Sequence, residues 1–244
     1  MLLKNIAASI ILSHFANSGA VEQMDLLAIW FLLIFGVFVP YVAFQSGRRV
    51  RAGAPVPPRK RIFINVLVMQ ILFLSISLLT TRFREIDLFA AGKVSRNAII
   101  LAIGMLGIGL GVMPLFWRRS SEDEKRQTLL ARPNEPKDLG WWFLVSLAAG
   151  TVEEITYRGV MFALLLPMTR NRWMAAAICV SFFALGHANQ KLSRMTFIGA
   201  IAIGCHALVW MTGALYLAMA MHFTYDFIAG IIYLRWARQM SPAG

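Results

Sequence analysis

The sequence has little charge, few acidic residues and only two cysteines, and each shortage argues against a class of protein. Of its 244 residues, 15% are charged and 58% are hydrophobic, a balance that is rare in soluble domains of this length. Cys179 and Cys205 both lie in apolar segments, so we expect buried packing residues rather than a disulfide framework. The net charge of +12 does not indicate a nucleic-acid partner, because the basic residues flank apolar runs.

Long uncharged runs are present instead. The stretch "LLAIWFLLIFGVFVPYVAF" is one of several that are long enough to cross a bilayer as a helix, which takes about 20 residues. We therefore expect an all-α polytopic membrane protein that is embedded in the lipid bilayer. The sequence predicts about seven transmembrane helices, at 24–44, 62–81, 98–117, 140–166, 173–188, 195–211 and 213–234. Gly107 and Gly111 have the spacing that lets two helices approach each other closely.

These spans form a single integral membrane domain with three parts. Residues 1–22 precede the first span and are an interfacial helix, a signal-like segment or part of an eighth span. Residues 23–139 hold three transmembrane helices and the basic loops. Residues 140–238 hold the remaining four helices, which we expect to carry the activity.

Basic residues are distributed unevenly between the two sides of these spans. If the seven spans alternate in direction, four regions lie on the same side of the membrane: 45–61, 118–139, 191–194 and 235–238. Most of the 24 basic residues fall in these regions. Because cytoplasmic loops carry an excess of Lys and Arg, this bias predicts an outside N-terminus and a cytoplasmic C-terminus. The compact chain favours a bacterial plasma membrane.

Ionisable residues within the expected spans are few. They are Glu153, Glu154, Arg158, His187, His206, His222 and Asp226. Charged side chains are rare in membrane helices and are usually functional there. Glu154 and Arg158 are four residues apart and can pair on one helix. Glu153 lies four residues before Tyr157 and has no such cation on its own helix.

We expect the polar residues of the fourth, fifth and seventh spans to converge on one cavity. His222 and Asp226 are four residues apart and therefore share a helix face. The alternative is a structural network that only holds the helices together. Two carboxylates and two histidines on three helices exceed what packing needs, because each uncompensated polar group is costly in the membrane. His206 is interpreted as a polar packing residue, with cavity lining as the alternative.

Such a set of side chains can hydrolyse an amide bond. A carboxylate in an apolar site can act as a general base on water, and a neighbouring imidazole can share that water. Donors on another helix can stabilise the oxyanion that develops on the attacked carbonyl. No serine or cysteine lies beside both a histidine and an acid in these spans, which argues against a covalent nucleophile.

Three motifs in this region resemble those of a known family. "EEITYR" has the form EExxxR, "FALGH" has the form FxxxH, and "HFTYD" has the form HxxxN/D. These motifs comprise Glu153, Glu154 and Arg158, then Phe183 and His187, then His222 and Asp226. Over residues 140–234, their order and spacing resemble the CAAX protease and bacteriocin-processing (CPBP, or Abi) family. That family includes the eukaryotic CAAX prenyl endopeptidases.

The resemblance implies an intramembrane endopeptidase in which Glu153 and His187 activate water. It also implies that His222 and Asp226 stabilise the oxyanion. The supporting residues that it implies around them are Glu154, Arg158, Tyr157 and Phe183. Prenyl proteases typically carry Asn where this chain has Asp226. Because an ionised Asp cannot donate a hydrogen bond, Asp226 must be protonated in that role, or it serves only to orient His222.

The expected partner is a membrane-associated protein or peptide substrate, and no cofactor is expected. Zinc is the alternative cofactor, because one Glu and two His form a permissible zinc set with an open position, although the sequence lacks HExxH. A non-enzymatic membrane scaffold or immunity factor is a second class of function. A transporter is a third, against which the lack of paired broken helices in two halves counts.

Overall fold

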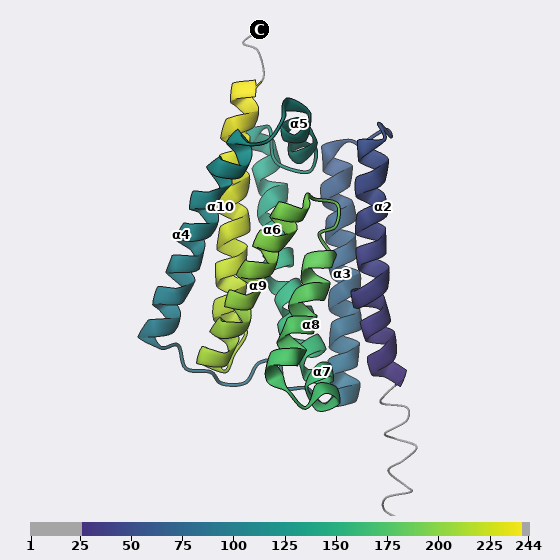
Figure 1. Ribbon diagram of the computed structural model, residues 1–244, viewed down its shortest axis with the longest axis vertical. Helices are drawn as coiled ribbons and strands as arrows, with labels where there is room; N and C mark the ends of the chain where they lie inside the picture. Colours follow the sequence, from purple (N-terminus) through teal and green to yellow (C-terminus); the bar gives the residue numbers. More distant parts are fainter. Residues whose placement is uncertain (1–25, 241–244) are drawn as a thin grey trace, which may run out of the picture.

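The structure is a computed structural model that describes residues 26–240, so the prediction for residues 1–22 lies outside the described residues. Within 26–240 the chain is helical and has no strand, which confirms the all-α fold (Figure 1). The first helix, Leu26–Arg51, contains the π-helical turn η1 (Ile34–Phe38) and α2 (Val39–Arg51). The next elements are α3 (Arg59–Arg84), α4 (Arg96–Arg118), α5 (Glu122–Leu130), η2 (Pro136–Asp138), α6 (Leu139–Glu154) and the π-helical turn η3 (Ile155–Met161). They are followed by α7 (Phe162–Thr169), α8 (Arg172–Leu185), α9 (Leu192–Thr212) and α10 (Tyr216–Met240).

Each of the seven expected spans corresponds to a helix or to one continuous helical run. Within the described chain, however, only five helices are both long and apolar enough to cross a membrane: Leu26–Arg51, α3, α4, α9 and α10. The run from α6 to α7 contains three charged residues, and α8 has 14 residues. That length of helix spans about 21 Å, less than the ~30 Å hydrocarbon core. The count of seven spans is therefore not confirmed. The two segments that are not among the five are the α6–α7 run, which carries the EExxxR motif, and α8, in which the FxxxH motif begins.

Local sequence signals set several helix ends. The Ser95 side chain accepts a hydrogen bond from the third residue of α4, and Ser121 and Glu124 form a reciprocal capping box at the start of α5. The Asn171 side chain accepts hydrogen bonds from two backbone N–H groups in the first turn of α8. Gly213 ends α9 with a φ of 70°, a left-handed conformation that glycine adopts without strain.

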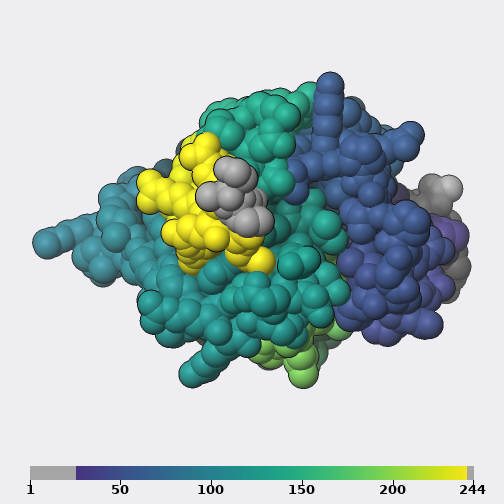
Figure 2. Space-filling view, turned by 90° about the horizontal axis from the view of Figure 1, so that it is seen from above, coloured from purple at the N-terminus to yellow at the C-terminus, as the bar shows by residue number. Residues whose placement is uncertain are grey.

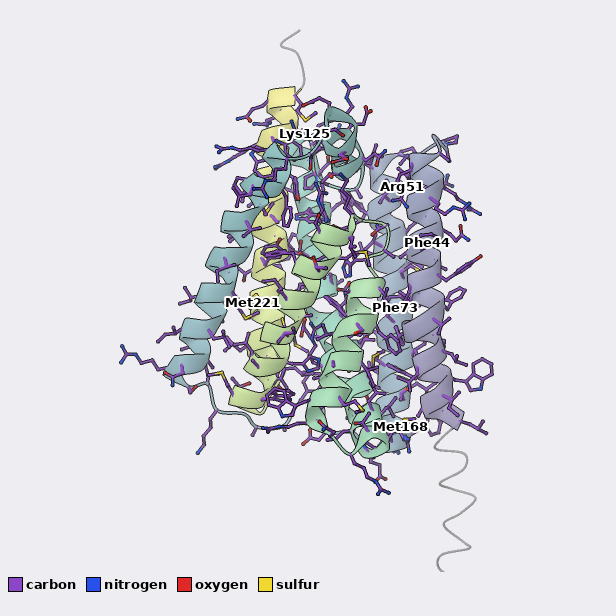
Figure 3. The ribbon with its side chains drawn as sticks, in the orientation of Figure 1. Phe44, Arg51, Phe73, Lys125, Met168 and Met221 are labelled. Carbon is purple, nitrogen blue, oxygen red and sulfur yellow. The ribbon has the colours of Figure 1, made fainter. Side chains whose placement is uncertain are left out.

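The basic regions lie at one end of the helical bundle. Figure 1 places the α2–α3 connection, α5 and the C-terminal end of α10 at this end, and the α3–α4, α7–α8 and α9–α10 connections at the other. Figure 2 looks onto the first end, and Figure 3 shows Arg51 and Lys125 near it and Met168 at the opposite end. An ion pair between Lys191 and Glu124 ties the α8–α9 connection to α5. The basic loops therefore lie together at one end of the bundle, as the charge pattern predicted.

Helices α6 and α10 pack very closely. A Cβ added at Gly150 would lie 2.6 Å from the backbone nitrogen of Phe223, so no larger residue fits there without a shift of α10. At the next contact along the pair, the Trp142 indole N–H donates a hydrogen bond to the backbone carbonyl of Asp226 at 3.0 Å. This contact fixes the helix that carries both glutamates against the helix that carries His222.

Small residues behave differently elsewhere in the bundle. Gly107 and Gly111 have no described atom within 4 Å of an added Cβ, so the close helix approach that their spacing would allow does not occur among residues 26–240. Gly109, between them, packs on the ring of Tyr225 instead. Cys179 and Cys205 are buried and free, as expected of packing residues.

Candidate active site

The two glutamates lie where α6 passes into the π-helical turn η3. A π-helical turn is uncommon and often occurs at functional sites. Glu154 is the last residue of α6, and Arg158 lies within η3. Glu154 and Arg158 are almost completely buried, whereas the Glu153 side chain remains 18% exposed. The adjacent acids thus occupy different environments, and only Glu153 has a partly exposed side chain.

Arg158 and Glu154 form the buried ion pair that their spacing predicted. Nη1 of Arg158 lies 3.3 Å from Oε1 of Glu154, and Nη2 donates to the backbone carbonyl of Ala202 in α9 at 3.3 Å. The guanidinium carbon lies 4.4 Å from the centroid of the Phe183 ring of α8. One cation therefore contacts three helical segments. A buried pair of this kind is strongly destabilised when one partner is removed.

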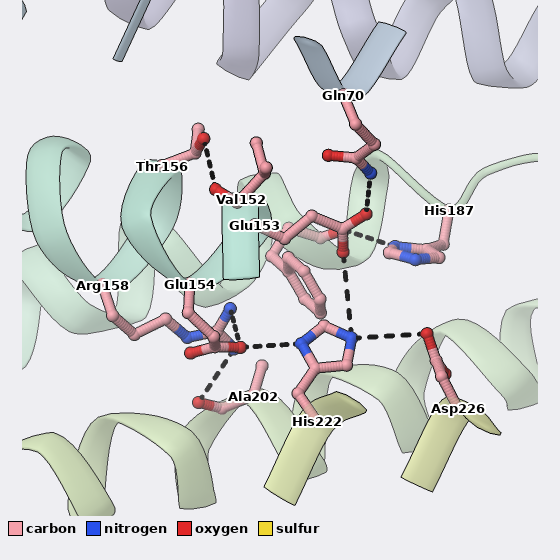
Figure 4. A network of polar contacts seen from close by, with 11 residues as sticks. Gln70, Val152, Glu153, Glu154, Thr156, Arg158, His187, Ala202, His222 and Asp226 are labelled. Atoms are coloured by element: carbon pink, nitrogen blue, oxygen red, sulfur yellow. Dashed lines mark hydrogen bonds and ion pairs between the residues drawn. The ribbon is translucent and has the colours of Figure 1, made fainter. Parts of the chain in front are cut away.

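His222 of α10 lies at the centre of the polar cluster. Its Nδ1 donates to Oε1 of Glu154 at 2.9 Å, while its Nε2 lies 4.0 Å from Oε2 of Glu153 and 3.7 Å from Oδ2 of Asp226 (Figure 4). An ionised carboxylate only accepts hydrogen bonds, so Nδ1 carries a proton in this contact. The Nε2 edge consequently faces Glu153 and Asp226. The predicted shared face of His222 and Asp226 is confirmed.

His187 lies in the turn that follows α8 rather than within the helix. Its Nδ1 is 2.9 Å from the carbonyl oxygen of Phe183, and because a carbonyl only accepts, Nδ1 carries the hydrogen. In the neutral imidazole, Nε2 is then the acceptor. The Phe183 ring contacts both imidazoles, with centroid distances of 4.9 Å to His187 and 6.1 Å to His222. Within the described chain, no hydrogen bond or ion pair joins His187 to Glu153.

Tyr157 is the other aromatic residue at this junction. Its ring lies 5.2 Å from that of Phe183 and 6.3 Å from that of Phe35 in η1, in edge-on arrangements. Such T-shaped contacts are favourable between aromatic rings. Tyr157 thus packs edge-on against the Phe183 ring, and its role in supporting a substrate cavity stays a prediction.

The segment after His187 is anchored to α5. Lys191 pairs with Glu124, and the hydrogen bond from Lys191 lowers the pKa of the Glu124 carboxyl. Arg194 donates to Oγ1 of Thr128 at 2.7 Å. The sequence indicated only a charged loop where α5 lies. The short helix α5 in fact holds the start of α9, and with it the turn that carries His187.

Gln70 of α3 is a member of the site that sequence reasoning missed. Its Nε2 donates to Oε1 of Glu153 at 2.8 Å, and the side chain is buried (Figure 4). In η3, three residues after Glu153, the Thr156 hydroxyl lies 3.0 Å from that of Ser77. Because the expected site was assembled from ionisable residues, a neutral amide was overlooked. The available signal was a lone glutamine in the apolar middle of a membrane helix, within the stretch VLVMQILFL.

His206 lies apart from the motif residues. Its ring packs 5.5 Å from Phe162 and 6.0 Å from Trp210, and it is buried. No hydrogen bond between its side chain and the cluster is present in residues 26–240. These contacts agree with the interpretation of His206 as a polar packing residue.

The donor groups do not form a metal-binding arrangement. Among the residues that the structure describes, no three His, Cys, Asp or Glu side chains are placed to hold one ion. Both nitrogens of His222 face carboxylates, and Oε1 of Glu153 accepts from an amide. The zinc alternative therefore lacks a ligand set in this part of the chain, and independence from metal stays a prediction.

Residues 135–228 match the family model described as type II CAAX prenyl endopeptidase Rce1-like. The resemblance to the CPBP family is thereby confirmed. The matched region begins before α6, ends within α10 and contains every motif residue from Glu153 to Asp226. The helices from α2 to α4 lie outside it. No curated protein and no solved structure matches the chain significantly. The apolar helices indicate an integral membrane protein, of which residues 135–228 are similar to the CAAX prenyl endopeptidases.

Proposed function

We propose that the protein is an intramembrane endopeptidase that hydrolyses a peptide bond in a membrane-associated protein or peptide. The observation that carries the proposal is the approach of Glu153 and Asp226 to Nε2 of His222, with the Phe183 ring in contact with both His222 and His187. Three helical segments supply these groups, and all of them fall in the region that matches the CAAX endopeptidases. A purely structural network would not need a partly exposed carboxylate beside the Nε2 edge of an imidazole.

Glu153 acts as the general base in this proposal. Its Oε1 is occupied by the Gln70 amide, so Oε2 is the oxygen that takes a proton from water. Nε2 of His187 accepts the second hydrogen of that water and orients it. The water oxygen then attacks the carbonyl carbon of the scissile bond. Glu153 passes the proton to the leaving amine as the tetrahedral intermediate collapses, which returns both groups to their starting states.

His222 and Asp226 stabilise the negative charge on the attacked carbonyl oxygen. The contact with Glu154 holds the His222 ring through Nδ1, which leaves its Nε2 edge for the oxyanion when that nitrogen is protonated. Asp226 lies beside this edge and donates when it carries a proton. Arg158 neutralises Glu154 and so fixes the orientation of the imidazole. Glu154 and Arg158 are therefore positioning residues.

The substrate is proposed to be a membrane-tethered tail. The CAAX endopeptidase match gives prenylated proteins as one precedent, and unprenylated membrane peptides are the other candidate. Purified protein in detergent or nanodiscs would be incubated with a farnesylated CaaX peptide, the same peptide without the lipid, and a hydrophobic helical tail. Mass spectrometry would map any cleavage site. We expect cleavage of at least one peptide, and no cleavage of any membrane peptide would contradict the proposal.

We also propose that the basic end of the bundle faces the cytoplasm. The uneven distribution of Lys and Arg supports this orientation. Single cysteines at Lys125 and Met168, which lie near opposite ends, would be tested with a membrane-impermeant thiol reagent on intact cells (Figure 3). The native Cys179 and Cys205 are buried and give little background. Labelling at position 168 but not at 125 is expected, and the reverse pattern would contradict the orientation.

A further inference from the structure

One helix outside the matched region presents a buried seam to α6 and η3. In α3, Phe63, Gln70 and Ser77 recur every seven residues and are buried, although only 17% of the most apolar part of the helix is buried. Phe63 packs near Trp142 with a centroid distance of 6.2 Å, and Ser77 lies 3.0 Å from the Thr156 hydroxyl. Gln70 occupies the middle of this seam, opposite the proposed general base.

The orientation of the Gln70 amide follows from its partner. Its Nε2 donates to Oε1 of Glu153 at 2.8 Å, and an ionised carboxylate accepts only from the NH₂ side of an amide. The amide oxygen, Oε1 of Gln70, is buried and has no hydrogen-bond partner. A structural amide is usually satisfied at both ends, because a buried unpaired carbonyl is costly. A water molecule or a peptide N–H placed beside Glu153 would satisfy this acceptor.

On the basis of the proposed function, we propose that Gln70 is a positioning residue that orients the Glu153 carboxylate for water activation. The amide engages Oε1 and leaves Oε2 for the proton, 4.0 Å from Nε2 of His222. Its free carbonyl accepts a hydrogen bond from the bound water or from the substrate backbone. The active site then includes a residue of α3, and residues 135–228 alone do not complete it.

A structural role and a positioning role predict different effects of pH. The donated N–H stabilises the ionised form of Glu153, so its removal makes the base harder to ionise. Other titratable or charged groups around Glu153 do not change in a Gln70 variant and serve as a constant background. They are Glu154, Tyr157 and Arg158 of its own helical run, His187 in the turn after α8, and His222 and Asp226 of α10.

The decisive variant is Gln70→Met, which keeps the length of the side chain but removes the amide. The matched control is Ser77→Ala, which removes the other polar contact of the same seam. Each is assayed for kcat, KM and the pH–rate profile with the peptide that the wild type cleaves. For Gln70→Met we expect kcat to fall about ten- to hundredfold, which is the usual effect of losing a hydrogen bond to a charged group. KM should change little, and the acidic limb of kcat should move to higher pH by about one unit.

The possible outcomes separate this inference from the proposed function. If the wild type cleaves and Gln70→Met matches Ser77→Ala in kcat and in pH profile, only the positioning role is rejected. A uniform loss at every pH, with an unshifted acidic limb, also rejects it in favour of a packing role. If Gln70→Met does not fold, Gln70→Leu and Gln70→Asn are tested against the same control and the same criteria. A wild type that cleaves no membrane peptide overturns both the proposed function and the inference.

Discussion

The N-terminal helices and the C-terminal helices of this protein meet the membrane in different ways. In α4, 22% of the most apolar segment is buried, and Ile100, Ile103 and Ile108 are each more than half exposed. In α9 the corresponding share is 33%, and Gly150 of α6 lies against the backbone of α10. The first region presents apolar side chains outward, whereas the second packs tightly around charged groups.

The difference shows where ionisable residues can be accommodated within a membrane protein. Removing one charge from water costs several kcal/mol, which must be offset by an opposite charge and hydrogen bonds. Arg158 obtains these from Glu154, from a carbonyl of α9 and from the Phe183 ring. The buried face of α4 consists of small and apolar residues such as Ala98, Ala102 and Met105, which cannot supply such a shell. The buried polar residues of α3, Gln70, Ser77 and Thr80, are all neutral.

The largest expected effect on stability is that of removing a charge from the buried pair. Arg158→Ala leaves Glu154 without its cation, so we expect the free energy of unfolding to fall by about 3–5 kcal/mol. Glu154→Gln should also destabilise the protein, because it leaves the guanidinium uncompensated. Thermal unfolding in detergent, followed by circular dichroism, measures both changes.

The control for the buried pair lies at the basic end. Lys137 and Glu135 are 2.5 Å apart, and their side chains are 77% and 52% exposed. Exposed pairs of this kind contribute about 0–1 kcal/mol, so Lys137→Ala should barely change the unfolding temperature. Equal effects of Arg158→Ala and Lys137→Ala would show that burial does not distinguish the two pairs.

The next effect concerns the oxyanion. If Asp226 donates a hydrogen bond, Asp226→Leu should lower kcat about 10²–10³-fold, whereas Asp226→Asn should keep or raise it. Asn donates at every pH, and Asp donates only when protonated. A loss of activity at high pH in the wild type should therefore be absent from Asp226→Asn. An Asn variant as inactive as the Leu variant would assign Asp226 the role of orienting His222 through the 3.7 Å contact.

Two glycine substitutions compare the two regions directly. Gly150→Ala places a Cβ 2.6 Å from the backbone of α10, and overpacking of this kind typically costs about 1–3 kcal/mol. Gly107→Ala adds a methyl group where no atom lies within 4 Å, so we expect a change in stability within about 1 kcal/mol. The two melting temperatures test this difference. A larger loss for Gly107→Ala would indicate that α4 has a packing partner outside this chain.

The smallest expected effect is that of a chelator. We expect activity to survive prolonged treatment with a strong chelator, and the purified protein to hold no stoichiometric zinc. The charged groups of the cluster contact one another and form no three-ligand arrangement within 26–240. Elemental analysis would be paired with the activity assay. One zinc per chain that is lost together with activity, and restored together with it, would overturn the metal-free mechanism.

Much of the arrangement could be predicted from the sequence. The apolar runs predicted the long helices, because a bilayer requires about 20 apolar residues for a span. The four-residue spacings predicted the Glu154–Arg158 and His222–Asp226 contacts, because such residues are neighbours on a helix. Convergence of the three motifs followed from the high cost of leaving each polar group alone in lipid.

The remaining features depend on tertiary contacts that have no local signal. Helical spacing does not show that Nδ1 of His222 contacts Glu154 rather than Glu153, because this depends on how α10 packs against α6. The π-helical turn η3 and the anchoring of the α8–α9 connection to α5 are likewise set by packing. Gln70 is separated from Glu153 by 83 residues, and only the three-dimensional structure brings them together.

The most direct test of the central claim is the cleavage rate of Glu153→Gln beside that of the wild type in the same lipid. The substitution is nearly isosteric and keeps hydrogen-bonding capacity towards α3, but an amide cannot take a proton from water. The account predicts a folded protein, shown by an unchanged unfolding temperature, whose single-turnover rate is lower by about 10²–10⁴-fold. His187→Ala should behave similarly. Near-wild-type cleavage by folded Glu153→Gln would contradict the assignment of Glu153 as the general base.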